Sequence, residues 1–289
     1  MHSIPSILQD YIKENIAYPV GIIGCRATDP ETSLECCEYD LAIFGQQQLE
    51  SNKVLKVGNH TIELINLPIV HSQDRLATKD MILMPNKDCL LLPSFLSSQN
   101  YANLLRAFGR KLMISSAFYH QRIMSNLHKS DVLASIWLKL SAYDFLEGLL
   151  AVSGFKPMPI HELSQIRQLT MKNQVVANAV KDALECIGLE RASTTSIRRS
   201  SEGLVKLRYR QYDTDLFISK VQYMLKRGML SDCYYYIGKI ASRDLIKNER
   251  TENYDMKLTQ TVLDLNHDVI KIERLHANLF VACKLLLNY

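Results

Sequence analysis

The chain has 289 residues, of which 47% are hydrophobic and 22% charged, a composition typical of a globular protein with one or two domains. No stretch approaches the ~18 uninterrupted apolar residues that a membrane helix needs. The N-terminal segment also lacks the basic and then apolar pattern of a secretory signal, so we expect a cytoplasmic protein with no membrane partner. The cysteines include no C-x-x-C pair, which argues against a disulfide framework and against a zinc site.

The net charge of +4 is distributed unevenly along the chain. Residues 1–100 contain 7 Lys and Arg against 12 Asp and Glu, whereas residues 101–289 contain 27 against 18. An acidic first third suits a bound cation, and a basic remainder suits phosphate groups. Charge alone favours the simpler interpretation that both regions are solvated faces.

Short apolar runs alternate with turn residues through the first hundred residues. They are rich in β-branched and aromatic side chains, which favours strands, and Gly58-Asn59 predicts a hairpin turn between two of them. Helices are expected over 3–17 and around 70–80, so residues 1–95 are predicted to form a small mixed-sheet domain. The strands are expected at residues 19–25, 39–44, 53–57, 60–67 and 81–85.

Apolar residues recur at helical spacing over the rest of the chain, which predicts an α-helical bundle over 96–289 and an α+β fold overall. His161 and Glu162 follow two prolines and are expected to open a helix; a metal site at this pair is the alternative. The segment 191–210 is rich in Ser, Thr and Arg. We expect it to be a flexible connection, and a basic arm on a polyphosphate or nucleic acid is the second interpretation.

Three carboxylates interrupt apolar strands near the N-terminus. Glu38 and Asp40 are two positions apart, so both project from the same face of their strand, and Glu63 interrupts a later strand in the same way. Neighbouring carboxylates repel each other and resist burial unless a cation lies between them. Mg²⁺ prefers one or two carboxylates together with phosphate oxygens. The pattern therefore predicts a metal site, provided that the Glu63 strand lies beside the Asp40 strand.

The order of these residues resembles nucleotidyltransferases of the DNA polymerase β-like superfamily. That family has an apolar residue, Gly, and Gly or Ser, followed after a spacer by an acid–apolar–acid–apolar strand and by a further acid on a later strand. Here Ile23-Gly24-Cys25 is followed after 12 residues by Glu38-Tyr39-Asp40-Leu41, and Ile62-Glu63-Leu64 lies downstream. Cys25 stands where the family has Ser or Gly, and Glu38 where Asp is commoner. The resemblance covers about the first 90 residues of the chain.

The resemblance implies metal-dependent transfer of a nucleoside monophosphate from an NTP, such as ATP, to a hydroxyl acceptor. Glu38, Asp40 and Glu63 would hold two Mg²⁺ or Mn²⁺ ions, with Glu63 the best candidate to activate the acceptor. By the same resemblance, the turn at Gly24 and Cys25 would contact the triphosphate, assisted by Arg26.

The acceptor is not identified by the sequence; RNA, protein and a small molecule all stay open, as does the oligomeric state. The alternative to an enzyme is a non-catalytic nucleotide- or RNA-binding protein on the same fold. The substitution Cys25 is the feature that favours it, because a thiol is a weak hydrogen-bond donor.

Other candidate groups lie in the helical region. Arg122 and His128 have the spacing of the helical ribonuclease-like domains that accompany some small nucleotidyltransferases, a spacing also expected by chance. Asp144 and Glu147 would either line an acceptor pocket or lie on a solvated helix face. The cluster Tyr234–Tyr236 would either stack on bases or pack in the core.

Overall fold

The protein has an α+β fold, as the sequence predicts, with a five-stranded mixed sheet near the N-terminus and helices in the rest of the chain. A computed structural model shows two compact units, Met1–Leu104 and Leu105–Tyr289. The structure describes residues 4–45, 53–68, 72–84, 96–171, 174–207, 213–248, 256–265 and 268–287.

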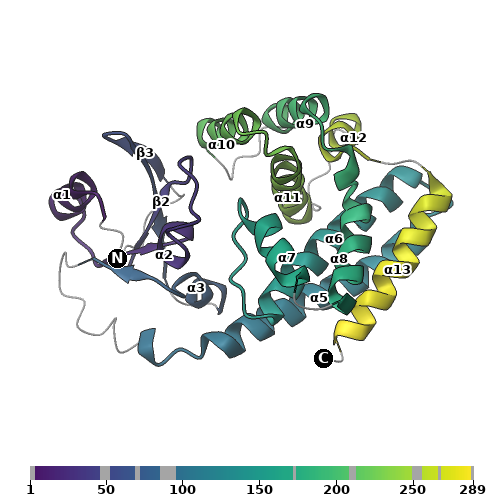
Figure 1. Cartoon of the computed structure of the whole chain (residues 1–289), viewed down its shortest axis with the longest axis horizontal. Helices are drawn as coiled ribbons and strands as arrows, with labels where there is room; N and C mark the ends of the chain where they lie inside the picture. Colours follow the sequence, from purple (N-terminus) through teal and green to yellow (C-terminus); the bar gives the residue numbers. More distant parts are fainter. Residues whose placement is uncertain are drawn as a thin grey trace. The chain divides into compact units, whose positions relative to one another are not determined.

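The N-terminal unit is built on a sheet with the strand order β3-β4-β2-β1-β5 (Figure 1). Only β2 and β4 run parallel; the other neighbouring pairs are antiparallel. Helices α1, α2 and α3 accompany the strands. In chain order the elements are α1 (Ser6–Asn15), β1 (Val20–Ile23), α2 (Cys25–Thr28), β2 (Tyr39–Ile43), β3 (Lys53–Val57), β4 (His60–Asn66), α3 (Ser72–Ala77) and β5 (Ile82–Leu83).

The strands that the apolar runs predict are confirmed, and so is the hairpin. Val57 pairs with His60 across the turn, where Gly58 has a φ of +57° that favours glycine. The parallel pairing of β2 with β4 places the last strand of the hairpin inside the sheet, between β3 and β2. Residue 85, at the end of the fifth predicted run, lies outside the described residues.

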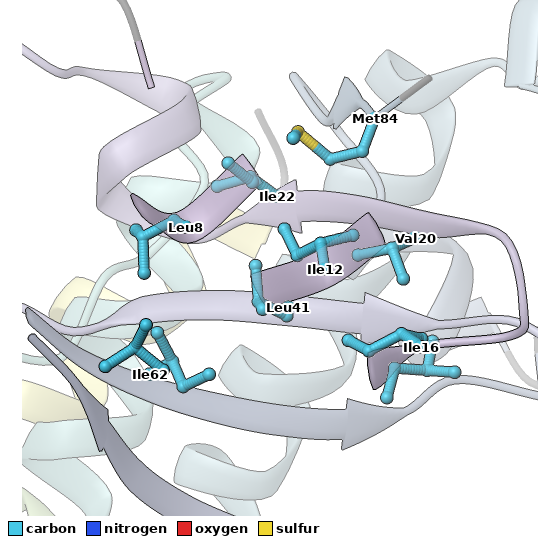
Figure 2. Packing of buried hydrophobic residues seen from close by; sticks show 10 residues of the cluster. Leu8, Ile12, Ile16, Val20, Ile22, Leu41, Ile62 and Met84 are labelled. Atoms are coloured by element: carbon cyan, nitrogen blue, oxygen red, sulfur yellow. The ribbon is translucent and has the colours of Figure 1, made fainter. Parts of the chain in front are cut away.

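Helix α1 covers one face of this sheet. Figure 2 shows Leu8 and Ile12 of the helix over Ile22, Leu41 and Ile62 of three neighbouring strands, and all five side chains are buried. Burying a side chain of this size stabilises the fold by roughly 1.5–3 kcal/mol. A smaller apolar cluster occupies the other face of the sheet, where it is formed by Ile23, Ala42, Phe44 and Leu67.

The C-terminal unit is entirely helical in its described part. Helices α6, α8 and α13 pack together, and α9 packs against both α11 and α12 (Figure 1). None of the described helices is long and apolar enough to cross a lipid bilayer. The elements are α5 (Tyr101–Asn126, which begins in the N-terminal unit), α6 (Asp131–Val152), α7 (Glu162–Thr170), α8 (Gln174–Ile187), the 3-10 helix η1 (Leu189–Arg191), α9 (Thr194–Lys206), α10 (Thr214–Lys226), α11 (Leu230–Asn248), α12 (Met256–Leu263) and α13 (Val269–Leu287).

Helices α5 and α6 cross in backbone contact. A Cβ atom added at Gly109 would lie 2.6 Å from the carbonyl oxygen of Gly148, and the reverse distance is 2.8 Å. The hydroxyl group of Ser116 accompanies this contact with a hydrogen bond to the Ser141 side chain at 2.9 Å. Small residues at the crossing therefore let the two helices approach closely, as they do wherever helix backbones meet.

The expectation of a flexible basic connection over 191–210 is wrong for most of its length, because the segment forms η1 and α9. A capping box starts α9: the Ser193 side chain accepts from the Ser196 backbone N–H, and the Ser196 side chain accepts from the Ser193 N–H. Ile197 is fully buried on the inner face of the helix. Serines that suggested a loop therefore cap and line a helix. Residues 208–210 lie outside the described part.

Candidate metal centre

Strands β2 and β4 bring the three predicted carboxylates together. Asp40 and Glu63 are direct partners in the parallel register, and Glu38 lies one residue before β2 on the same side as Asp40. Each of the three side chains is half-buried and offers an oxygen atom, and these atoms all lie within 4.8 Å of one another. The sequence prediction that the Glu63 strand lies beside the Asp40 strand is confirmed.

The pleat of the sheet explains why the carboxylates share one face. Leu41 projects into the core under α1, so Asp40 projects to the opposite face, where Ala42 and Ile23 form the second apolar cluster. Glu63 occupies the same face of β4, because its neighbour Ile62 is buried under α1. The carboxylates therefore lie at the edge of an apolar surface, where charge attraction is stronger than in bulk water.

The chemistry of these donors fits a hard divalent cation. Mg²⁺ holds oxygen ligands at about 2.1 Å, so two ligands of one ion lie up to about 4.2 Å apart. Oxygens within 4.8 Å of one another reach that spacing by small side-chain rotations. Three carboxylates this close repel one another, and a divalent ion is the group that offsets the repulsion most directly. Glu38, Asp40 and Glu63 would hold such an ion.

Gly24 sits against this carboxylate cluster. It ends β1 with a φ of +74° and a ψ of −160°, a conformation essentially restricted to glycine. A Cβ atom at this position would lie 1.9 Å from Oδ2 of Asp40, so only a residue without a side chain leaves the carboxylate its place. The glycine carbonyl then accepts from the N–H groups of Ala27 and Thr28, which starts α2. The Gly24 turn therefore lies directly against the Asp40 carboxylate.

Cys25 follows the glycine as the first residue of α2 and is half-buried. Its sulfur lies within 4.8 Å of the Cys37 sulfur. A hydrogen bond with Cys37, then burial, then the charges of Asp40 and Glu38 raise the pKa of the Cys25 thiol far above its ordinary value. The side chain is therefore a neutral thiol beside the carboxylates. The prediction that this turn contacts a triphosphate stays a prediction.

Arg26 braces the loop that leads to Glu38. Its guanidinium group donates to the Cys37 carbonyl at 2.9 Å, and to the Leu34 carbonyl and the Ser33 hydroxyl at 3.2 Å each. The same group lies over the Tyr39 ring, 4.9 Å from the centroid. The sequence did not indicate this role, because the contacts join residues without any periodic spacing. A phosphate contact by Arg26 stays a prediction.

The helical unit buries a second set of charges, which corrects one prediction. Asp144 and Glu147 do not lie on a solvated helix face; they are 8% and 6% exposed. Glu147 pairs with Lys239 at 2.6 Å and with Arg243 at 2.7 Å, and Lys239 also lies 3.2 Å from Glu162. A buried cation between buried carboxylates holds α6, α7 and α11 together. The network is an internal ionic brace.

The pKa values of this network follow from its pairing. Burial raises the pKa of Asp144 to about 7, although the Lys239 and Arg243 charges oppose the shift. Burial acts on Glu147 in the same direction, but the two cations outweigh it and lower the pKa of Glu147 to about 2. Glu147 is therefore a charged carboxylate between two cations, and its neighbour Asp144 carries a proton below neutral pH.

The other candidate residues of the helical unit lie on or next to α5, α7 and α11. Tyr234–Tyr236 are all buried, which favours packing over stacking on bases, and Tyr235 donates to Glu162 at 2.7 Å. Helix α7 begins at Glu162, as predicted, with His161 as its N-cap. Arg122 stacks on the Trp137 ring at 4.2 Å, and His128 lies exposed beyond the end of α5.

Comparison of the chain with protein-family models, curated proteins and solved structures finds no match. The residues and their geometry therefore carry the functional interpretation.

Proposed function

We propose that the chain is a metal-dependent nucleotidyltransferase, which moves a nucleoside monophosphate from an NTP to a hydroxyl acceptor. The observation that carries the proposal is the parallel register of Asp40 with Glu63, which gathers three carboxylate oxygens within 4.8 Å together with Glu38. Carboxylates at this spacing on neighbouring strands suit divalent ions that also bind phosphate oxygens. The resemblance of the motif to DNA polymerase β-like enzymes supports the same chemistry.

Each side chain of the site has a role in the proposed reaction. When bound, divalent ions supply charge that stabilises the attacking and the leaving oxygens. Glu38, Asp40 and Glu63 would hold the ions, and Gly24 leaves room for the Asp40 carboxylate. Glu63 accepts the proton of the acceptor hydroxyl. The acceptor oxygen forms a bond to the α-phosphorus of the NTP, and the bond from that phosphorus to the bridging oxygen breaks, so pyrophosphate leaves.

One observation favours a second candidate, a protein that binds nucleotide without transferring it. The Nη1 and Nη2 groups of Arg26 donate to the Ser33, Leu34 and Cys37 loop positions, and Cys25 is a neutral thiol engaged with Cys37. Phosphate contacts from these two side chains would need the loop to rearrange. A binding protein would retain metal and nucleotide affinity and show no transfer.

Incubation with each α-labelled NTP tests the proposal directly. The protein is mixed with Mg²⁺ or Mn²⁺ and with total RNA, a protein extract or small hydroxyl compounds as acceptors. We expect label to move to one acceptor class with the native chain and with Asp10→Asn, an exposed carboxylate of α1 that serves as the control. Asp40→Asn should show no transfer. Nucleotide binding without any transfer would support the second candidate and contradict the first.

A further inference from the structure

Helix α5 carries a strongly basic exposed face. The chain has no Asp or Glu between residues 89 and 130, and Tyr101–Asn126 contains four Lys and Arg residues. All four are exposed, namely Arg106, Arg110, Lys111 and Arg122. The first three form no ion pair with any residue that the structure describes. A helix of this length without a single carboxylate attracts polyanions at every point of its exposed face.

The spacing places an aromatic side chain between the cations. Lys111, Ser115, Phe118, Arg122 and Ser125 recur at intervals of three and four residues, so they form one stripe along the helix. Phe118 is 68% exposed, although a phenylalanine of a folded protein usually packs inside. The exposed Phe118 ring therefore lies between the positive charges of Lys111 and Arg122 along the stripe.

A groove opens on this part of the helix. Its volume is about 530 Å³. The Tyr119 ring lies 5.3 Å from the Trp137 ring of α6, and the Arg122 guanidinium covers the same indole at 4.2 Å. These contacts hold the arginine and the tyrosine in fixed positions. The described lining residues are Ser115, Phe118, Tyr119, Gln121, Arg122 and Ser125, which combine aromatic rings, hydroxyl and amide groups and a cation.

We infer that this face of α5 binds single-stranded nucleic acid. The cations match the phosphates of the backbone, and the rings offer surfaces on which unpaired bases stack. A protein partner with an apolar patch would match Phe118 but would gain nothing from the cations of this face. A duplex would match the cations but has no exposed base faces for the ring. The combination of both features selects a single strand.

The salt dependence of binding tests the electrostatic half of this inference. Fluorescence anisotropy of the full chain is measured with labelled oligouridine or oligothymidine of about 20 nucleotides, between about 50 and 200 mM salt. In Arg106→Gln/Arg110→Gln/Lys111→Gln, we expect the slope of log K against log salt to become shallower by about 2, since each cation contributes about 0.7.

The matched control is a triple variant that removes three positive charges from helices other than α5. Lys181, Lys206 and Lys226 are exposed on α8, α9 and α10, and their replacement by Gln should leave the slope unchanged. Equal changes of slope in both triple variants would overturn the inference, and so would the absence of any binding at the lowest salt. Competition by polyglutamate as effective as competition by unlabelled oligonucleotide would assign the face to acidic proteins and overturn it too.

Phe118→Ala tests the stacking half. Because the ring is largely exposed, the variant should fold normally, and single-strand affinity should fall roughly 5- to 100-fold while affinity for a duplex stays the same. Met171→Ala, at an 86% exposed position outside α5, is the control and should bind as the native chain does. Equal loss for single strand and duplex would contradict stacking. These measurements need no metal, so their outcome is independent of the transfer reaction.

Discussion

Replacing Gly24 by alanine perturbs the candidate metal centre at its tightest point. The residue has a φ of +74° and a ψ of −160°, and forcing a residue with a Cβ into that region costs about 1–3 kcal/mol. The new Cβ would lie 1.9 Å from Oδ2 of Asp40, so the carboxylate must turn away from the cluster. We therefore expect a loss of about 1–3 kcal/mol in stability and roughly 10- to 100-fold weaker Mn²⁺ binding.

Two measurements separate the effects. The free energy of unfolding in urea, measured without metal, gives the cost of the backbone strain. Isothermal titration with Mn²⁺ gives the metal affinity of the carboxylates. Gly228→Ala is the matched control, because Gly228 has a similar φ of +69° but no atom within 4 Å of an added Cβ. The control should lose stability and keep its Mn²⁺ affinity. Unchanged Mn²⁺ binding in Gly24→Ala would refute the role that we assign to the glycine and the carboxylate.

Three further predictions concern the braces around and beyond the site. Lys239→Met should cost about 3–5 kcal/mol in urea unfolding, because it leaves buried Glu162 without its cation and Glu147 with Arg243 only, and an unchanged unfolding midpoint would contradict the ionic brace. The native Asp144 pKa of about 7 exceeds the ordinary value of 3.8, so its contribution to stability is present at low pH and lost as pH rises from about 4 to 7. The free energy of unfolding should therefore fall less over that pH range in Asp144→Asn than in the native chain. Parallel plots of this free energy against pH for the two proteins would refute the raised Asp144 pKa. Arg26→Met should increase amide exchange over residues 33–37, where the guanidinium donates hydrogen bonds, and unaltered exchange there would show that the loop needs no brace.

Local patterns in the sequence were sufficient to predict the sheet and the carboxylate cluster. Apolar and aromatic residues between turn signals predict strands such as Tyr39–Ile43. The alternation of side chains along a strand then determines which of them share a face. Asp40 and Glu63 are conspicuous because each breaks an apolar run. The strand order was not predicted from the sequence. The structure shows it in the hairpin at Gly58 and in the parallel pairing of β2 with β4.

Tertiary contacts determine what the sequence could not show. Asp144 and Glu147 have the spacing of a solvated helix face, and only α7 and α11, far along the chain, bury them and provide Lys239 as a partner. The serines at 193 and 196 suggest a loop, but they cap α9, because the same hydroxyl chemistry serves turns and helix starts. The Arg26 brace joins loop positions that carry no period.

The position of a bound ion is the most direct test of whether Glu38, Asp40 and Glu63 form a metal site. Crystals of the full chain grown with Mn²⁺ and a non-hydrolysable NTP analogue are measured at the manganese absorption edge. We expect anomalous density within about 2.2 Å of carboxylate oxygens from Glu38, Asp40 and Glu63, with the phosphates of the analogue on the same ion. Anomalous density bound elsewhere, with these three carboxylates holding no ion beside a bound analogue, would contradict it.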